Sequence, residues 1–135
     1  MIKRILILIF PLALIFQSCD PQPSVTPPEK DVQVEETQAL QDMLAELEEI
    51  AGSETCIKPA DWVYTPYGDK ACGGPQGYLA YSINIDTEDF LKKVKAYTEA
   101  ERDYNRKWGI VSDCALHPAP IGINCEGGKA VLQYR

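Results

Sequence analysis

Basic residues, histidine and closely spaced cysteine pairs are all scarce in this chain of 135 residues. The chain has 13 basic residues against 20 acidic ones, and its only histidine is His117. Binding to a phosphate backbone requires clustered lysine and arginine, so we expect no nucleic acid partner. No two cysteines have the two-to-four-residue spacing that is usual for zinc sites. The sequence therefore predicts no metal and no cofactor.

A lone histidine also gives little support to catalysis. His117 precedes Pro118, and the sequence shows no partner for it, whereas catalytic triads and Cys–His dyads need further groups. Carboxylates are abundant, but most fall on predicted helix surfaces, and general acid–base chemistry needs a cleft. We predict no catalytic residues, and a small envelope hydrolase is the third of three functions considered.

The N-terminus carries the strongest localisation signal. Lys3 and Arg4 precede an apolar run over residues 5–16, which ends at Ser18 and Cys19. The run is too short for a hydrocarbon core of about 30 Å, which needs roughly 20 helical residues, and it is typical of an export signal. A small residue directly before a cysteine resembles the lipobox of bacterial lipoprotein precursors.

The lipobox resemblance implies a signal peptide over residues 1–18 and lipid attachment, with palmitate among the acyl groups, at Cys19. Several acyl chains hold a protein stably to a membrane. We therefore expect a lipoprotein of the bacterial cell envelope, facing the periplasm or the exterior, with a net charge of −9 after removal of Lys3 and Arg4. An ordinary secretory signal and a retained membrane anchor are the alternatives.

The other four cysteines are Cys56, Cys72, Cys114 and Cys125. An even number in an exported chain predicts two disulfides, with three possible connectivities. If Cys114 pairs with Cys125, they close a short loop that Pro118 and Pro120 stiffen, and Cys56 pairs with Cys72. Crossed pairings remain open.

The predicted organisation has three parts after the signal. Residues 19–34 are a proline-rich tether, because they offer little apolar material to bury. Residues 35–52 are an acidic amphipathic helix, with apolar residues at helical spacing on one face. We expect this helix to pack on its own domain, and pairing with another chain is the alternative. Residues 53–135 form a small disulfide-bonded domain.

That domain is predicted to be α+β, with a short antiparallel sheet and one long amphipathic helix. Strands are expected at residues 62–65, 78–85, 110–112 and 130–134, from alternating or β-branched and aromatic residues. The long helix begins at Asp86 or Thr87 and ends at Gly109, which suits the left-handed position after a helix. The glycine-rich segment 70–77 precedes a strand rather than a helix, so it predicts a turn that positions Cys72 and not a phosphate loop.

Two groups of residues are candidates for binding. Aromatic side chains that flank the glycine-rich turn serve either as core or in recognition; they are Trp62, Tyr64, Tyr67, Tyr78 and Tyr81. The second group lies in the segment between Cys114 and Cys125 and consists of His117, Pro118 and Pro120. Residues 56–125 resemble uncharacterised small cysteine-containing secreted bacterial proteins, and this resemblance implies no activity.

The predicted function is a membrane-anchored binding or recognition module with a protein or glycan partner in the envelope. Inhibition of a hydrolase is one form of that role, because a rigid closed loop lowers the entropy cost of binding. A structural component of a larger envelope assembly is the alternative.

Overall fold

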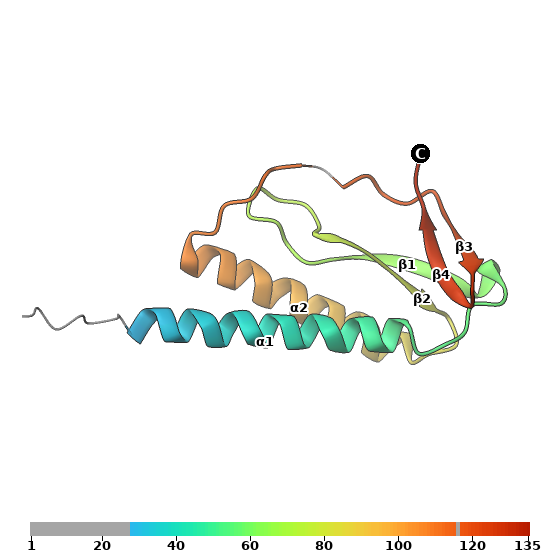
Figure 1. The fold of residues 1–135 in the computed structure, drawn as a ribbon, viewed down its shortest axis with the longest axis horizontal. Helices are drawn as coiled ribbons and strands as arrows, with labels where there is room; N and C mark the ends of the chain where they lie inside the picture. The colour runs from blue at the N-terminus through green and yellow to red at the C-terminus, as the bar shows by residue number, and fades with distance from the viewer. Residues whose placement is uncertain (1–27, 116) are drawn as a thin grey trace, which may run out of the picture.

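The computed structural model describes residues 28–115 and 117–135, so Cys19 and the predicted signal peptide lie outside the described residues. The chain forms α1 (Pro28–Ala51), a short 3-10 helix η1 (Pro59–Asp61), β1 (Trp62–Tyr67), β2 (Gly77–Ser82), α2 (Thr87–Trp108), β3 (Gly122–Glu126) and β4 (Lys129–Gln133). This is the predicted small α+β class. In Figure 1, α1 and α2 lie beside each other on one side of β1–β2, and the C-terminal segment crosses the other side.

Helix α1 begins at Pro28 rather than at Glu35. The predicted tether is therefore wrong for residues 28–34, and its first part, residues 19–27, lies outside the described residues. A proline is compatible with the first turn of a helix, because the missing N–H has no partner there. Contacts with α2 also reach this half of α1: Glu36 accepts from Trp108 Nε1 at 2.7 Å, and the Thr37 and Tyr104 hydroxyls are 2.8 Å apart.

Helix α2 confirms the predicted caps. Asp86 precedes it, and the Asp86 side chain accepts a hydrogen bond from the backbone N–H of Asp89 at 3.0 Å. Gly109 ends it in the left-handed conformation, with φ 58°. The backbone N–H of Ile110 then returns to the Asn105 carbonyl at 3.0 Å. These local signals fix both ends of the helix.

Charged pairs join the two helices. Lys93 Nζ lies 2.7 Å from Glu46 on α1, and 3.9 Å from Asp89 on its own helix. Lys107 Nζ lies 2.5 Å from Glu36. Exposed pairs of this kind each contribute at most about 1 kcal/mol.

Neither described helix is long and apolar enough to cross a membrane.

Strands β1 and β2 pair antiparallel, from Trp62 opposite Ser82 to Tyr67 opposite Gly77. The second strand was predicted to reach residue 85, and this is wrong: the strand ends at Ser82. The backbone N–H of Asn84 bonds to the Ser82 hydroxyl at 3.1 Å, so the chain turns there toward α2.

Strands β3 and β4 form a separate antiparallel sheet, so the described chain has two two-stranded sheets in place of one. Strand β4 corresponds to the predicted strand at residues 130–134, whereas β3 was not predicted. Residues 110–112 form no strand. The Ser112 hydroxyl accepts a hydrogen bond from the Cys72 backbone N–H at 3.3 Å.

The core lies between the helices and the inner face of β1–β2. Phe90 of α2 and Leu47 of α1 are almost completely buried, and Tyr81 of β2 packs on Phe90 with ring centroids 4.8 Å apart. Full burial of such a side chain contributes about 1.5–3 kcal/mol. Helix α1 supplies Leu47 and Ala51 to the same core as α2, so residues 28–51 and the C-terminal part fold as one packed unit.

The structure confirms that the four cysteines form two disulfides. They are Cys56–Cys125 and Cys72–Cys114, each with Cα atoms 5.3 Å apart. The closed loop that a Cys114–Cys125 bond would make is therefore absent from the described chain. This nested connectivity arises because β3 returns to the start of the domain, where the backbone N–H of Cys56 bonds to the Gly128 carbonyl at 2.8 Å.

Candidate functional site

The aromatic candidates divide between the two faces of the β1–β2 sheet, because side chains alternate along a strand. Tyr67 and Tyr81 belong to the inner face, where they contact Tyr97 and Phe90 of α2. Tyr81 is buried in the core, and Tyr67 is partly buried against it. Trp62, Tyr64 and Tyr78 belong to the outer face, and the rings of Tyr64 and Tyr78 meet edge to face at 5.8 Å. The outer face therefore keeps three of the five candidates.

A groove of about 630 Å³ lies where the outer face meets the second hairpin. Such a volume falls within the range of ligand pockets. The groove is bordered by β2, β4, the end of α1 and the segment after it, and its lining residues are Glu48, Ala51, Gly52, Glu54, Trp62, Tyr78, Leu79, Ala80, Gly128, Lys129, Ala130, Val131, Leu132 and Tyr134. Trp62 is itself buried and forms part of the wall, whereas Tyr134 is 48% exposed.

The second hairpin is shaped by its glycines and its disulfide. Gly127 and Gly128 form a two-residue turn with φ 58° and 81°, and positive φ at both positions is typical of a type I′ hairpin turn. Cys125 ties β3 to the chain just before η1. In Figure 1, β3 and β4 stand at a steep angle to β1–β2. The groove is the space that this crossing leaves open.

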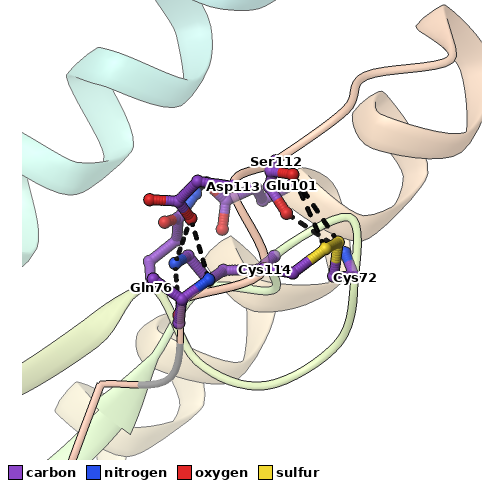
Figure 2. Close-up of polar contacts among 8 residues, drawn as sticks. Cys72, Gln76, Glu101, Ser112, Asp113 and Cys114 are labelled. Carbon is purple, nitrogen blue, oxygen red and sulfur yellow. Dashed lines mark hydrogen bonds and ion pairs between the residues drawn. A yellow bond between two sulfur atoms is a disulfide. The ribbon is translucent and has the colours of Figure 1, made fainter.

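The opposite end of the molecule holds a polar cluster around the glycine-rich turn. Lys70 is 7% exposed, and its ammonium donates to Asp113 Oδ1 at 2.9 Å and to the Ala115 carbonyl at 2.7 Å. The Cys72–Cys114 disulfide joins the same two segments (Figure 2). The Lys70 ammonium therefore holds the glycine-rich turn against the segment after α2. This structural role agrees with the prediction that residues 70–77 form a turn.

The carboxylate of Glu101 on α2 accepts hydrogen bonds from the residues that flank that turn. Its carboxylate accepts from the Asp69 backbone N–H at 2.6 Å, from Gln76 Nε2 at 3.1 Å and from the Tyr97 hydroxyl at 3.3 Å. Gly68 lies so close that a Cβ there would be 2.5 Å from Glu101 Oε2. This role of Glu101 was not predicted, although the residue falls four positions after Tyr97 within the apolar stripe of α2, which is a usable signal.

Burial and charge shift several pKa values in this region, among them those of Tyr97 and Asp113. Burial, followed by the nearby Glu101 carboxylate, raises the pKa of Tyr97 well above its usual value. The hydrogen bond from Lys70, helped by the Ala115 backbone N–H, lowers the pKa of Asp113. These shifts favour the neutral form of Tyr97 and the charged form of Asp113.

The segment between Cys114 and Cys125 follows the outer face of the first sheet. Tyr64 donates its hydroxyl proton to the Pro120 carbonyl at 2.8 Å, and Pro120 is buried. His117 and Pro118 are exposed. The structure thus brings Tyr64 together with Tyr78 and Pro120, and leaves His117 and Pro118 at the surface. Of the residues predicted to bind, Trp62 and Tyr78 alone line the groove.

The groove lining also includes residues that were not among the predicted site residues, such as Tyr134, Leu132 and Glu54. The Gly127–Gly128 pair, flanked by residues of alternating polarity, is the signal that predicts a hairpin here. Recognising it would have revealed β3 and the exposed edge of β4. Within residues 28–115 and 117–135, no three histidine, cysteine or acidic side chains converge as metal ligands would.

The fold and its site define a small α+β domain with two crossed hairpins, two disulfides and an aromatic-lined groove. Comparison with protein family models, curated proteins and solved structures finds no match to the chain.

Proposed function

We propose that the protein is a lipid-anchored lipoprotein of the bacterial cell envelope that acts as a recognition module. Its partner, a protein or a glycan, binds in the groove between β2 and β4. The observation that carries this proposal is the groove itself, because it combines a ligand-sized volume with the Trp62, Tyr78 and Tyr134 rings. Tyrosine and tryptophan are enriched where proteins recognise partners, since they offer apolar area with a polar tip.

The location rests on two independent features. The pattern from Lys3 to Cys19 resembles a lipobox signal, and two disulfides are typical of chains that fold in an oxidising compartment. Mass spectrometry of the native protein tests the anchor. We expect an N-terminus at Cys19 carrying acyl groups, and a chain that retains Met1 with a free Cys19 thiol would refute it.

The inhibitor form of this role has lost its main structural support. It depended on a short loop closed by a Cys114–Cys125 bond, but each of these cysteines bonds to a distant segment. The groove supports recognition without requiring such a loop, so the broader role is the one proposed.

Affinity capture from envelope extracts tests the recognition role. The bait is the full-length protein in detergent, compared with Tyr78→Ala in the groove and with Pro118→Ala on the exposed loop outside it. We expect Tyr78→Ala to lose most of the captured partner, while Pro118→Ala retains it. Equal recovery with both variants would place the contact elsewhere, and would favour the structural-component alternative if a stoichiometric complex persists.

A further inference from the structure

The groove borders two strand edges that have no partner strand. Each sheet of the described chain has two strands, so β2 and β4 each have one open edge. The lining of the groove includes consecutive residues of both strands, Tyr78–Ala80 of β2 and Lys129–Leu132 of β4. Residues from both faces of a strand border the same space only where that space runs along the edge of the strand. The groove therefore gives access to backbone groups as well as side chains.

The register identifies which backbone groups point into the open. In a two-residue hairpin the residues that flank the turn form a hydrogen-bonded pair, and such pairs alternate with non-bonded ones. Glu126 pairs with Lys129, and Cys125 pairs with Ala130. Ala130 and Leu132 thus direct their N–H and C=O groups away from β3, toward the free edge.

Strand β2 also has backbone groups that point toward its free edge. The backbone N–H of Ile83 bonds to the Asp61 carbonyl at 2.9 Å, so the backbone N–H of Ile83 points toward the β1 side. Alternation then directs the backbone groups of Tyr78 and Ala80 away from β1. Pro66 of β1 lies opposite Tyr78 in a non-bonded pair. It removes a donor from the outer edge of β1, as prolines on edge strands do, whereas β2 and β4 contain no proline.

The charges on the groove indicate the kind of peptide it suits. Glu48 and Glu54 line it together with one basic residue, Lys129, and the whole chain has a net charge of −7. Complementary charge selects partners and speeds their encounter. A basic segment therefore fits this surface better than an acidic one.

We propose that the groove binds an extended, basic peptide segment of a partner protein, which adds as a strand to the open edge of β4 while its side chains contact Tyr78 and Tyr134. Strand addition uses backbone hydrogen bonds for affinity and flanking pockets for selectivity. This proposal rests on the recognition role above and commits it to a protein ligand rather than a glycan.

The test is a titration of the full-length protein in detergent with a capped pentapeptide of alternating valine and lysine, Val-Lys-Val-Lys-Val. Two matched peptides serve as controls: one methylated on every backbone nitrogen, and one with glutamate in place of lysine. We expect NMR amide shifts at Ala130 and Leu132 with the first peptide. Loss of two backbone hydrogen bonds should weaken the methylated peptide by about tenfold or more, and the acidic peptide should also bind more weakly.

A protein variant checks the same edge from the other side. Ala130→Pro removes an outward N–H while leaving the β3–β4 bonds in place, and we expect it to weaken the basic peptide by about tenfold. Ile83→Ala, at an exposed position outside the groove, should bind as the parent does. Because Ala130→Pro could disturb the hairpin, its thermal unfolding is measured alongside, and the methylated peptide tests the edge without altering the protein.

The outcomes separate this inference from the recognition role. Equal binding of the methylated and parent peptides, or shifts that avoid β4, would overturn strand addition. Failure of all peptides to bind would overturn it too, while Tyr78-dependent capture of an envelope partner would leave the recognition role standing. A stable dimer in which the two β4 edges pair would assign the edge to a second copy and overturn the peptide ligand.

Discussion

The two disulfides lie in different surroundings, although their covalent chemistry is the same. Cys72 and Cys114 are both exposed, and the segments they join are also held by the Lys70 ammonium and by the hydrogen bond from the Cys72 N–H to Ser112. Cys56 is buried, and the bond to Cys125 has one backbone hydrogen bond beside it, from Cys56 to Gly128. One disulfide reinforces a cluster that has several other polar contacts, and the other joins β3 to the segment before η1 with fewer hydrogen bonds beside it.

This difference matters because the site lies at the end with fewer alternative links. The groove exists only while β4 stays against β2, and β2–β4 contact is modest compared with the pairing inside each hairpin. The polar end, by contrast, fixes the turn before β2 and so positions Tyr78 from a distance. The comparison predicts that damage at the two ends will have unequal effects on stability and on the groove.

The largest effect is expected from removing Cys56–Cys125. The bond spans 69 residues, and loop closure alone gives about 4 kcal/mol for such a length. We expect the double variant Cys56→Ala with Cys125→Ala to lose about that much unfolding free energy in denaturant titrations, and to lose ligand binding in the groove.

The matched control is Cys72→Ala with Cys114→Ala. Its bond spans 42 residues, so the loop-closure contribution is nearly the same. We expect a smaller loss here, because the Lys70 and Ser112 contacts continue to hold the two segments. A loss equal to or greater than that of the first double variant would contradict the comparison.

Next in size is Glu101→Ala, for which we expect a loss of about 2–3 kcal/mol. The change leaves the Asp69 N–H and the Gln76 amide without their buried acceptor, and unsatisfied buried groups are costly. Glu99→Ala, on the exposed side of the same helix, breaks only an i,i+4 pair with Lys95 and should cost a few tenths. Equal losses in urea unfolding would show that the carboxylate does not support the turn.

Alanine substitutions at two glycines near the turn distinguish the cost of a left-handed backbone from the cost of steric crowding. Gly68 and Gly74 have φ 73° and 87°, but only at Gly68 would a Cβ meet Glu101 and Gln76. Alanine at Gly74 should cost about 1–2 kcal/mol from the left-handed conformation, and alanine at Gly68 should cost more. Combining Gly68→Ala with Glu101→Ala should cost less than the sum of the two, and strict additivity would rule out the crowding.

The smallest effect is the pH dependence that the Lys70–Asp113 pair contributes. The lowered pKa of Asp113, caused first by the Lys70 hydrogen bond, means that its contribution is complete above the usual aspartate pKa and is lost as the pH falls below it. We expect thermal stability to decline in that acid range, and Asp113→Asn to make the decline shallower. If thermal stability depends on acid pH in the same way in Asp113→Asn, the Lys70–Asp113 pair does not make the predicted contribution.

Helix α2 could be predicted almost to the residue, because Asp86, Gly109 and the apolar stripe are local signals. The start of α1 at Pro28 could not, since residues 28–34 offer little apolar material to bury, and Val32 and Val34 lie exposed in the helix. The disulfide count followed from composition, but the connectivity depended on β3 returning to Cys56, which is a long-range event.

The site was predicted only in part, for a similar reason. The density of aromatic residues pointed to all five candidates, and strand alternation places Tyr78 and Tyr81 on opposite faces, but neither signal says which face packs on the helices. The groove requires two hairpins to cross, and sequence periodicity specifies the faces of a strand without specifying which sheets meet. Glu101 was hidden because acids in amphipathic helices usually face solvent.

The most direct test of the central claim is site-specific photo-cross-linking in the native envelope. A photoreactive residue replaces Tyr134 in the groove or Ile83 outside it, positions that are 48% and 51% exposed and so equally accessible. We predict a discrete cross-linked partner from position 134 and none from position 83. A partner captured from position 83 alone, or no adduct from the groove, would contradict recognition at this site.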